Sequence, residues 1–360
     1  MQLAEVNEGI GVAMHPNHGS VSAPMPGVPA TGRSGWSGRK WMQSLRRVLN
    51  RQAGFLLLYT MITQLLGLFV GLLAQLEWNI LADPNESHRS IEYIVDHTDA
   101  EYAGTINLVM GLCGLVFLVL MRRRQIADGG PTGIFHRSQY RMTWSVFLGC
   151  FFLLFSAQLI AEIYGIGLGW TTEVMGLGSI RTTSDIIEAA GDTLPMLAYT
   201  YFVAPVVEEI VFRGAILNSL KPYGKVFAIV TTSAMFGFFH GDLTQGLFAF
   251  VVGLILGYLS CEYSIFWSIL VHISNNLIVS NLLGSWLSGL NADQTDLAAL
   301  VFLIACFVGL ILVPSLSRRR IRAFVMENRT YSNAYGSWAA PWFVVLLITE
   351  GMSMLYLLIS

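Results

Sequence analysis

The stretch from 206 to 217, VVEEIVFRGAIL, places three charged side chains inside an apolar run. If this run crosses a membrane, each charge costs about 2.5–3.5 kcal/mol on insertion scales, so such residues indicate a functional site unless a partner explains them. Glu209 and Arg213 are four residues apart, so they share a helix face and can pair. Glu208 is rotated by about 100° and has no local partner. Pro205 can loosen the helix just before the pair.

Two further apolar runs carry polar side chains at helical spacing. In FGFFHGD, Phe236 and His240 are four residues apart, and in HISNN, His272 and Asn276 have the same spacing. Four residues make about one helical turn, so each pair lies on one face of its helix. If the three helices pack together, the two histidines and Asn276 can converge with Glu208.

These residue types are suited to the hydrolysis of an amide bond. A carboxylate and a histidine that face one cavity can activate water by general base catalysis. A second histidine with an amide donor can stabilise an oxyanion. No serine or cysteine nucleophile is evident in this set, so an activated water is the expected attacking group.

The elements that must position these residues are transmembrane helices. Of the 360 residues, 54% are hydrophobic and 12% charged, with a mean hydropathy of +0.58, whereas soluble domains carry about 25% charged residues. A span needs about 20 apolar residues. Such runs lie at about 54–76, 102–121, 143–164, 194–219, 225–240, 243–260, 264–283, 297–316 and 339–359. The sequence predicts an all-α polytopic membrane helix bundle of about nine transmembrane helices.

The basic residues predict the orientation of this bundle. With nine spans, 18 of the 21 Lys and Arg residues fall on one side. Arg89 and Arg181 fall on the other side, and Arg213 lies within a span. Because cytoplasmic loops are enriched in Lys and Arg, we expect a cytoplasmic N-terminus and a C-terminus outside.

The chain divides into four predicted regions. Residues 1–53 are rich in Gly, Pro and Ser and turn basic at their end, which predicts a disordered basic cytoplasmic tail. The basic end, RKWMQSLRRVLNR, fits either a short amphipathic helix on an anionic membrane surface or simple positive-inside flanking charge. Residues 54–192 form N-terminal transmembrane helices and loops, 193–285 a catalytic core, and 286–360 C-terminal transmembrane helices.

The three motifs together resemble those of a known family. They are EExxxR at Glu208, Glu209 and Arg213, FxxxH at Phe236 and His240, and HxxxN at His272 and Asn276. Their order on successive spans is similar to that of the CAAX-protease and bacteriocin-processing family (CPBP or Abi), which are intramembrane glutamic endopeptidases. The resemblance covers roughly residues 195–285, about a quarter of the chain.

The resemblance implies a role for each motif residue. Glu208 would activate the water and His240 would assist it. His272 and Asn276 would form the oxyanion hole. The remaining motif residues would support the site structurally: Glu209, Arg213 and Phe236.

The expected protein is thus an intramembrane endopeptidase in a bacterial plasma membrane. It would hydrolyse a peptide bond of a membrane-associated or prenylated peptide with a water activated by glutamate and histidine. The expected partners are this peptide or lipidated-peptide substrate, the lipid bilayer and, for the tail and the last two spans, a membrane protein. No nucleic-acid motif is present, and neither a metal nor another cofactor is expected.

Other functions remain open. Glu208, His240 and His272 would satisfy a catalytic zinc in a membrane protease, although HExxH is absent. A non-catalytic scaffold or immunity protein would use the same helices to bind a partner. A transporter is disfavoured because the polar groups cluster at one depth instead of following a path through the membrane.

Overall fold

The computed structural model describes residues 38–81, 91–130, 132–136, 140–176, 193–278, 289–330 and 333–359. These residues form helices and connecting turns, with no β-strand among them. Seven of the described helical segments are long and apolar enough to cross a membrane. The protein is therefore an all-α, polytopic integral membrane protein, as the sequence predicts. The count of nine spans, the sides of the termini and the division into four regions stay predictions.

The helices follow the predicted apolar runs closely. The longer ones are α1 (Gly38–Leu81), α2 (Ile91–Ala127), α3 (Trp144–Val174), α8 (Lys225–Phe239), α9 (Leu243–Glu262), α10 (Ile265–Leu277), α12 (Ala292–Phe307), α13 (Val313–Asn328) and α14 (Pro341–Ile359). Short helices join some of them, namely η4 (Lys221–Tyr223), η6 (Val308–Leu312) and η7 (Ala334–Ala339). The run at 194–219 is a composite helix of α5 (Leu194–Ala198), η2 (Tyr199–Val203), α6 (Ala204–Glu209), η3 (Ile210–Leu217) and α7 (Asn218–Leu220).

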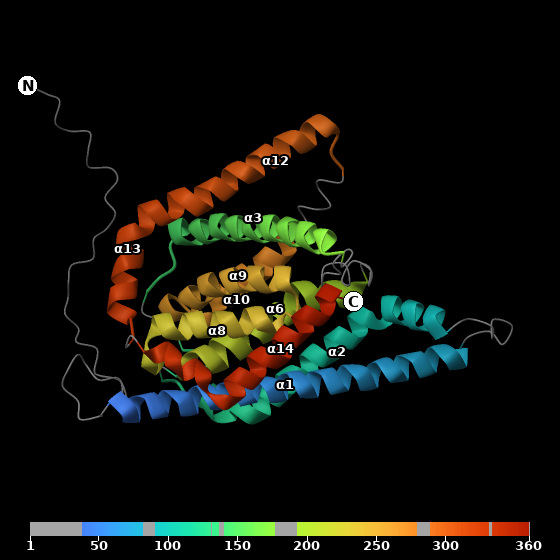
Figure 1. Ribbon diagram of the computed structural model, residues 1–360, viewed down its shortest axis with the longest axis horizontal. Helices are drawn as coiled ribbons and strands as arrows, with labels where there is room; N and C mark the ends of the chain where they lie inside the picture. The colour runs from blue at the N-terminus through green and yellow to red at the C-terminus, as the bar shows by residue number, and fades with distance from the viewer. Residues whose placement is uncertain are drawn as a thin grey trace, which may run out of the picture.

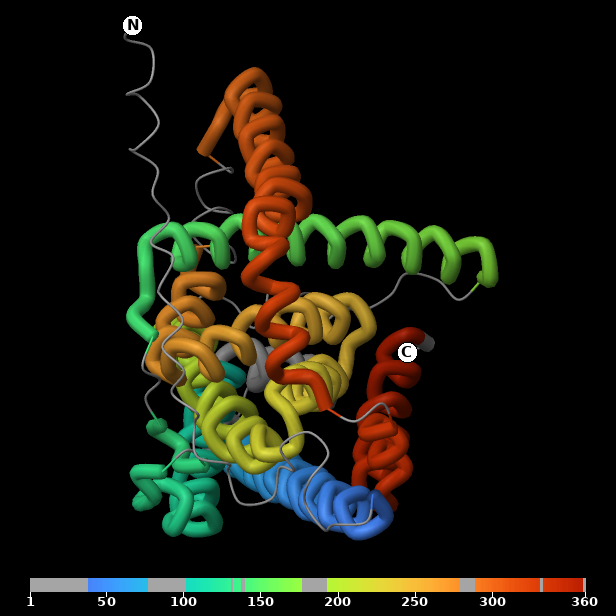
Figure 2. The backbone as a smooth tube through the Cα atoms, turned by 90° about the vertical axis from the view of Figure 1, so that its left-hand side faces the viewer, coloured from blue at the N-terminus to red at the C-terminus, as the bar shows by residue number. Residues whose placement is uncertain are grey.

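The helices stack in layers around a central group. Figure 1 shows α6, α8, α9 and α10 in the middle, with α1, α2 and α14 on one side and α3 on the other. Figure 2, turned by 90°, shows α12 beyond α3, on the side away from α1. The three sequence motifs are all carried by the central group, which the outer helices cover.

The beginning of α1 differs from the predicted tail. Residues 1–37 lie outside the described residues, but α1 starts at Gly38, so residues 38–53 are helical and not part of a disordered tail. Trp41, Leu45 and Leu49 are buried on one face of this segment, and the Trp41 ring meets Tyr223 edge-on at 5.9 Å. The segment is ordered because its apolar face packs against the protein itself.

The composite helix changes its winding on both sides of the glutamate pair. Pro205 lacks an N–H, so it removes one α-helical hydrogen bond at the start of α6. Ahead of it, the Ala204 N–H bonds to the Tyr199 carbonyl five residues back, which is the π-helical pattern. A second π-helical stretch, η3, follows Glu209 directly. π-Helical turns are rare and are frequent at functional sites.

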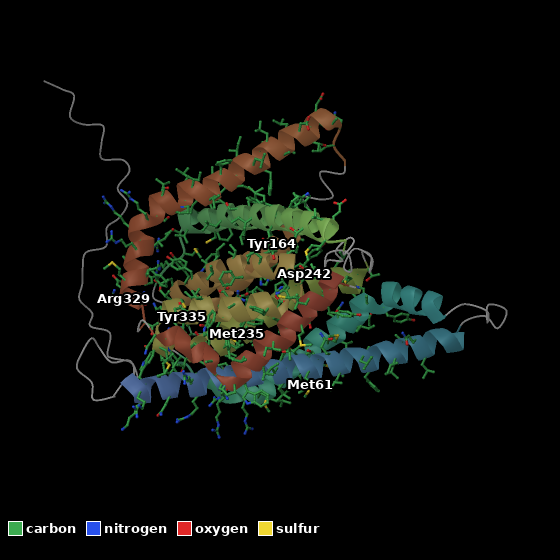
Figure 3. The ribbon with its side chains drawn as sticks, viewed as in Figure 1. Met61, Tyr164, Met235, Asp242, Arg329 and Tyr335 are labelled. Carbon is green, nitrogen blue, oxygen red and sulfur yellow. The ribbon has the colours of Figure 1, made fainter. Side chains whose placement is uncertain are left out.

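The hairpin of α8 and α9 sets the position of His240. With 15 residues, α8 is about 22 Å long, which is shorter than the hydrocarbon core of about 30 Å. Gly241 turns the chain with a φ of 64°, and Asp242 caps α9 by accepting the Gln245 N–H at 2.7 Å. At the other end, Lys225 and Glu262 form an ion pair at 2.7 Å. Figure 3 draws Asp242 and Arg329 toward opposite ends of the bundle.

The outer helices carry large apolar side chains on their exposed faces. Examples are Leu65, Leu68, Val116, Ile163, Leu297 and Ile348, each more than half exposed. By contrast, every residue of η3 in the central group is buried. An exposed apolar surface of this kind is expected for helices that face lipid.

Candidate active site

A buried ion pair anchors the site. Glu209 and Arg213 are almost completely buried, and their Oε1 and Nη1 atoms lie 3.0 Å apart. The predicted pairing of these residues is therefore confirmed. The Arg213 guanidinium also lies 4.3 Å from the centre of the Phe236 ring, in a cation–π contact. Because a lone buried charge is costly, each member of this pair makes the other tolerable.

Helix α10 brings two side chains to the Glu209 carboxylate. The Ser268 hydroxyl donates to Oε2, and His272 Nδ1 lies 3.0 Å from Oε1. An ionised carboxylate only accepts hydrogen bonds, so Nδ1 of His272 carries the hydrogen. The His272 ring is thereby fixed with its second nitrogen, Nε2, directed elsewhere.

That second nitrogen faces Glu208. His272 Nε2 lies 3.8 Å from Glu208 Oε2, so one imidazole stands between the two adjacent glutamates. The Glu208 side chain is 19% exposed, whereas Glu209 is fully buried. Tyr59 on α1 and Tyr199 on η2 also lie near enough to interact with the charge of Glu208. Glu208 is the carboxylate that a water molecule can reach.

His240 lies at the end of α8 and is held by its own helix. Its Nδ1 is 2.8 Å from the Phe236 carbonyl oxygen. A carbonyl oxygen can only accept, so Nδ1 carries the hydrogen and Nε2 of the neutral ring is an acceptor. His240 lies close enough to Glu208 and His272 to interact with their charges.

Phe236 connects the members of the site. Its ring meets the His240 ring at 4.7 Å and the His272 ring at 6.0 Å, both nearly perpendicular. It also packs edge-on against Phe212 at 4.9 Å. One aromatic ring therefore keeps both imidazoles and the Arg213 guanidinium in place, which fits the supporting role expected for Phe236.

Asn276 lies on α10 one turn beyond His272, but its contacts are with other residues. Its Nδ2 donates to the Thr200 carbonyl oxygen at 3.0 Å, and its Oδ1 accepts from Asn275 Nδ2 at 3.2 Å. An amide NH₂ has two hydrogens, so one remains for another acceptor. Among the described residues, Glu208, Glu209 and the two histidines therefore lie close together, and Asn276 lies at the edge of this group.

Sequence reasoning missed Ser268, the residue that holds Glu209 from α10. The signal was present, because Ser268, His272 and Asn276 follow one another at intervals of four in SILVHISNN. Asn275 lies off this helix face, yet it is buried and donates to the Asn276 amide oxygen. Both residues act on the site through hydrogen bonds that helix spacing alone does not specify.

A catalytic metal centre needs three donor side chains that converge on one point. Among the described residues, no group of three or more His, Cys, Asp or Glu side chains is arranged to hold a metal ion. The four cysteines are free thiols on separate helices. Both histidines direct Nδ1 to an oxygen acceptor and leave Nε2 toward the site.

The part of the chain that carries the site is similar to known proteins. Residues 190–278 match the family described as "Type II CAAX prenyl endopeptidase Rce1-like". A protein of Bacillus subtilis (strain 168) named "Putative membrane peptidase YdiL" is 30% identical over 177 residues, which are 46% of this chain and 66% of that protein. The chain thus spans just under two thirds of that relative's length. No solved structure matches the chain.

Proposed function

We propose that the chain is an intramembrane endopeptidase, because residues 190–278 match the Rce1-like family of CAAX prenyl endopeptidases. All seven motif residues lie within the matched range. The observation that carries the proposal is the imidazole of His272 between two carboxylates, one buried and paired with Arg213, the other accessible. This arrangement provides both a base and a charged donor inside an apolar bundle.

Glu208 is the proposed general base. It accepts a proton from a bound water, and the resulting hydroxide forms a bond to the carbonyl carbon of the scissile peptide. The tetrahedral intermediate then collapses, the carbon–nitrogen bond breaks, and the leaving amine takes the proton back from Glu208. Its accessibility and the absence of a hydrogen bond to Glu208 among the described contacts support this role, because a base must be free to bind water.

His240 is the proposed partner of Glu208 in holding the water. Its Nδ1 hydrogen is committed to the Phe236 carbonyl, so Nε2 offers a lone pair to a water hydrogen. A water held by one carboxylate and one imidazole acceptor directs an oxygen lone pair toward the substrate. Phe236 packs against the imidazole and limits its rotation.

His272 and Asn276 are the proposed donors to the oxyanion. Because Nδ1 of His272 is already used by Glu209, the ring donates from Nε2 only as an imidazolium. The Glu209 carboxylate stabilises that positive charge, as an oriented acid does for other catalytic histidines. The second amide hydrogen of Asn276 completes the oxyanion hole.

The proposed substrate is a membrane-associated or prenylated peptide. Support comes from the description of the matched family and from the relative named a membrane peptidase. The exposed apolar faces of the outer helices are typical of a protein that lies in the bilayer, where a substrate of this kind would also be found. The bacterial relative supports a location in a bacterial plasma membrane.

The proposal is tested first by cleavage of labelled hydrophobic and prenylated peptides with the purified protein in detergent. Replacing Glu208 by Gln keeps the size of the side chain but removes the base, so we expect cleavage to fall at least about 100-fold. Glu162→Gln is the matched control, because Glu162 is an exposed glutamate of α3 outside the site. The control is expected to cleave like the wild type.

Two outcomes would replace this proposal. Cleavage that a chelator abolishes and zinc restores would identify a zinc protease that uses Glu208, His240 and His272. Absence of cleavage, together with a cellular function that survives Glu208→Gln, would identify a scaffold or immunity protein.

A further inference from the structure

A basic cavity lies where α1 and α2 meet, outside the catalytic group. It has a volume of about 400 Å³ and contains four arginine side chains. They are Arg51 of α1 and Arg122, Arg123 and Arg124 of α2. Nothing in the proposed peptidase mechanism uses this cavity, because its side chains do not contact the motif residues.

Arg122 is the buried member of this cavity and has an unused donor. Its side chain is only 7% exposed, and Nη2 donates to Gln52 Oε1 at 2.7 Å. The guanidinium stacks over the Phe55 ring at 3.9 Å. Its Nε is buried and has no hydrogen-bond partner. A buried donor without a partner is costly, so the geometry points to an acceptor that is supplied from outside the protein.

The backbone of α2 is bent at this residue. Arg122 has a φ of −113° and a ψ of 15° within an otherwise continuous helix. This departure interrupts the helix where three arginines follow one another. All three line the cavity, and Arg122 is the buried one. The hydrogen bond to Gln52 and the cation–π contact with Phe55 hold the Arg122 side chain in this position.

The described part of the protein offers these positive charges no carboxylate partner. Among the described residues, no carboxylate forms an ion pair with any of the four guanidiniums. Asp128 follows in the chain, but its two oxygens accept from the Gly130 N–H at 2.8 Å and from the Thr132 hydroxyl at 2.9 Å. Four cations around one cavity repel one another, and a bound anion relieves that repulsion.

We propose that this cavity binds the phosphodiester headgroup of an anionic phospholipid. Arginine is suited to phosphate because its planar fork donates two parallel hydrogen bonds to neighbouring oxygens. Leu120 and Met121 line the same cavity and are 66% and 57% exposed, so apolar surface for acyl chains adjoins the basic groups. A free phosphate ion would gain nothing from that surface. Basic pockets between membrane helices on the cytoplasmic side bind lipid headgroups in this way.

The cavity is predicted to lie at the level of the lipid headgroups. In the chain, the apolar segment LVFLVLM of α2 ends directly before the three arginines. The charge pattern places this end on the cytoplasmic side, where anionic lipids concentrate. Gln125, also at the cavity, donates to the Ala215 carbonyl of η3 at 3.0 Å. A lipid bound here would therefore sit beside the helix that carries Arg213.

The test uses delipidated protein in nonionic detergent and short-chain lipids. Dioctanoyl phosphatidylglycerol is titrated while the melting temperature is followed, and bound lipid is counted by native mass spectrometry. We expect the wild type to be stabilised and to retain the lipid. The double variant Arg51→Gln/Arg124→Gln should need at least about tenfold more lipid for half the effect.

The matched control is the double variant Arg318→Gln/Arg319→Gln. Both residues are exposed on α13, lie on the same predicted side and do not line the cavity. This control should respond to the lipid like the wild type, although its net charge changes by the same amount. Equal weakening of the two double variants would overturn the proposal in favour of general electrostatic attraction.

Two ligand controls distinguish the source of the effect. Dioctanoyl phosphatidylcholine has the same acyl chains but no net charge, and an equal effect would mean that only the chains bind. Inorganic phosphate tested over the same concentration range identifies a free-anion site if it matches the lipid. Either result would overturn the proposal.

A second variant addresses the buried group without removing its charge. Arg122→Lys keeps the cation but loses Nε and the planar fork. We expect weaker binding of phosphatidylglycerol than in the wild type, with each protein compared with its own lipid-free melting temperature. If Arg122→Lys fails to fold, the double variant of the exposed Arg51 and Arg124 still tests the proposal.

Discussion

At the residue scale, the two adjacent glutamates face different surroundings, which is why we propose different roles for them. Glu209 is fully enclosed by Arg213, Ser268 and His272. Glu208, rotated around the helix, is partly accessible and lies opposite the far nitrogen of the same imidazole. One residue of displacement along the helix thus separates an enclosed carboxylate from an accessible one, which is the proposed general base. The seven motif residues could be named from spacing, but Ser268 required the packing of α10 against α6.

A prediction at this scale concerns Ser268. Its hydroxyl donates to a buried carboxylate, and hydrogen bonds to charged groups contribute about 1.5–3 kcal/mol. We expect Ser268→Ala to lower the melting temperature and to reduce kcat, because Glu209 then holds His272 less firmly. Ser274→Ala on the same helix is the control, with no expected effect. Full activity and stability of Ser268→Ala would show that the hydroxyl does not support Glu209.

At the element scale, the hairpin of α8 and α9 depends on a close crossing at two glycines. A Cβ added at Gly246 would lie 2.8 Å from the Gly237 carbonyl oxygen, and one at Gly237 would lie 2.7 Å from the Gly246 carbonyl oxygen. Only glycine allows the backbones to approach this closely. The crossing lies one turn from His240, so it fixes the depth at which that imidazole meets α10.

We therefore expect Gly246→Ala to separate the ends of α8 and α9. Overpacking of this kind costs about 1–3 kcal/mol, and the displaced His240 should lower cleavage further than the loss of stability explains. Gly167→Ala on α3 is the matched control, because a Cβ there meets nothing within 4 Å. Measured melting temperatures and cleavage rates separate the two effects. A Gly246→Ala protein as active as the control would contradict the importance of the crossing.

At the scale of the whole molecule, lipid-facing helices surround a polar centre. α1, α2, α3, α12 and α14 expose large apolar side chains, whereas no large apolar side chain of α6, α8 or α9 is exposed. Within the site, Glu209 is paired with Arg213, Ser268 and His272, as a medium without water favours. The basic ends of α2 and α13 are predicted to lie in the cytoplasm together.

The orientation can be measured by labelling cysteine variants in intact cells. Asp128→Cys and Glu327→Cys lie at ends of the bundle that we predict to be cytoplasmic, and Asp293→Cys at an end that we predict to be outside. A membrane-impermeant maleimide should label only Asp293→Cys until the cells are permeabilised. The wild type reports the background from its own four cysteines. The reverse pattern would invert the predicted orientation, and labelling on one side only would change the number of spans.

The sequence by itself determined what depends on local geometry. Each apolar run, as far as it is described, lies on a helix, although α1, α2 and α13 extend well beyond their runs. Spacing by four places Glu209 beside Arg213 and Phe236 beside His240, because a helix repeats on about that interval. For residues 38–53 the sequence left both a disordered tail and an amphipathic helix open, and the structure shows a helix whose apolar face packs on the protein and not on a membrane surface.

Only the tertiary structure decided which faces of distant helices meet. It placed His272 between Glu208 and Glu209, brought Ser268 to the buried carboxylate and turned the Asn276 amide toward Thr200. The tertiary structure also shows the bend of α2 at Arg122 and a cavity among its arginines, which the sequence indicates only as positive charge beside a span. The physical reason is that a helix fixes its own periodicity, whereas its rotation and crossing angle depend on the side chains of every neighbour.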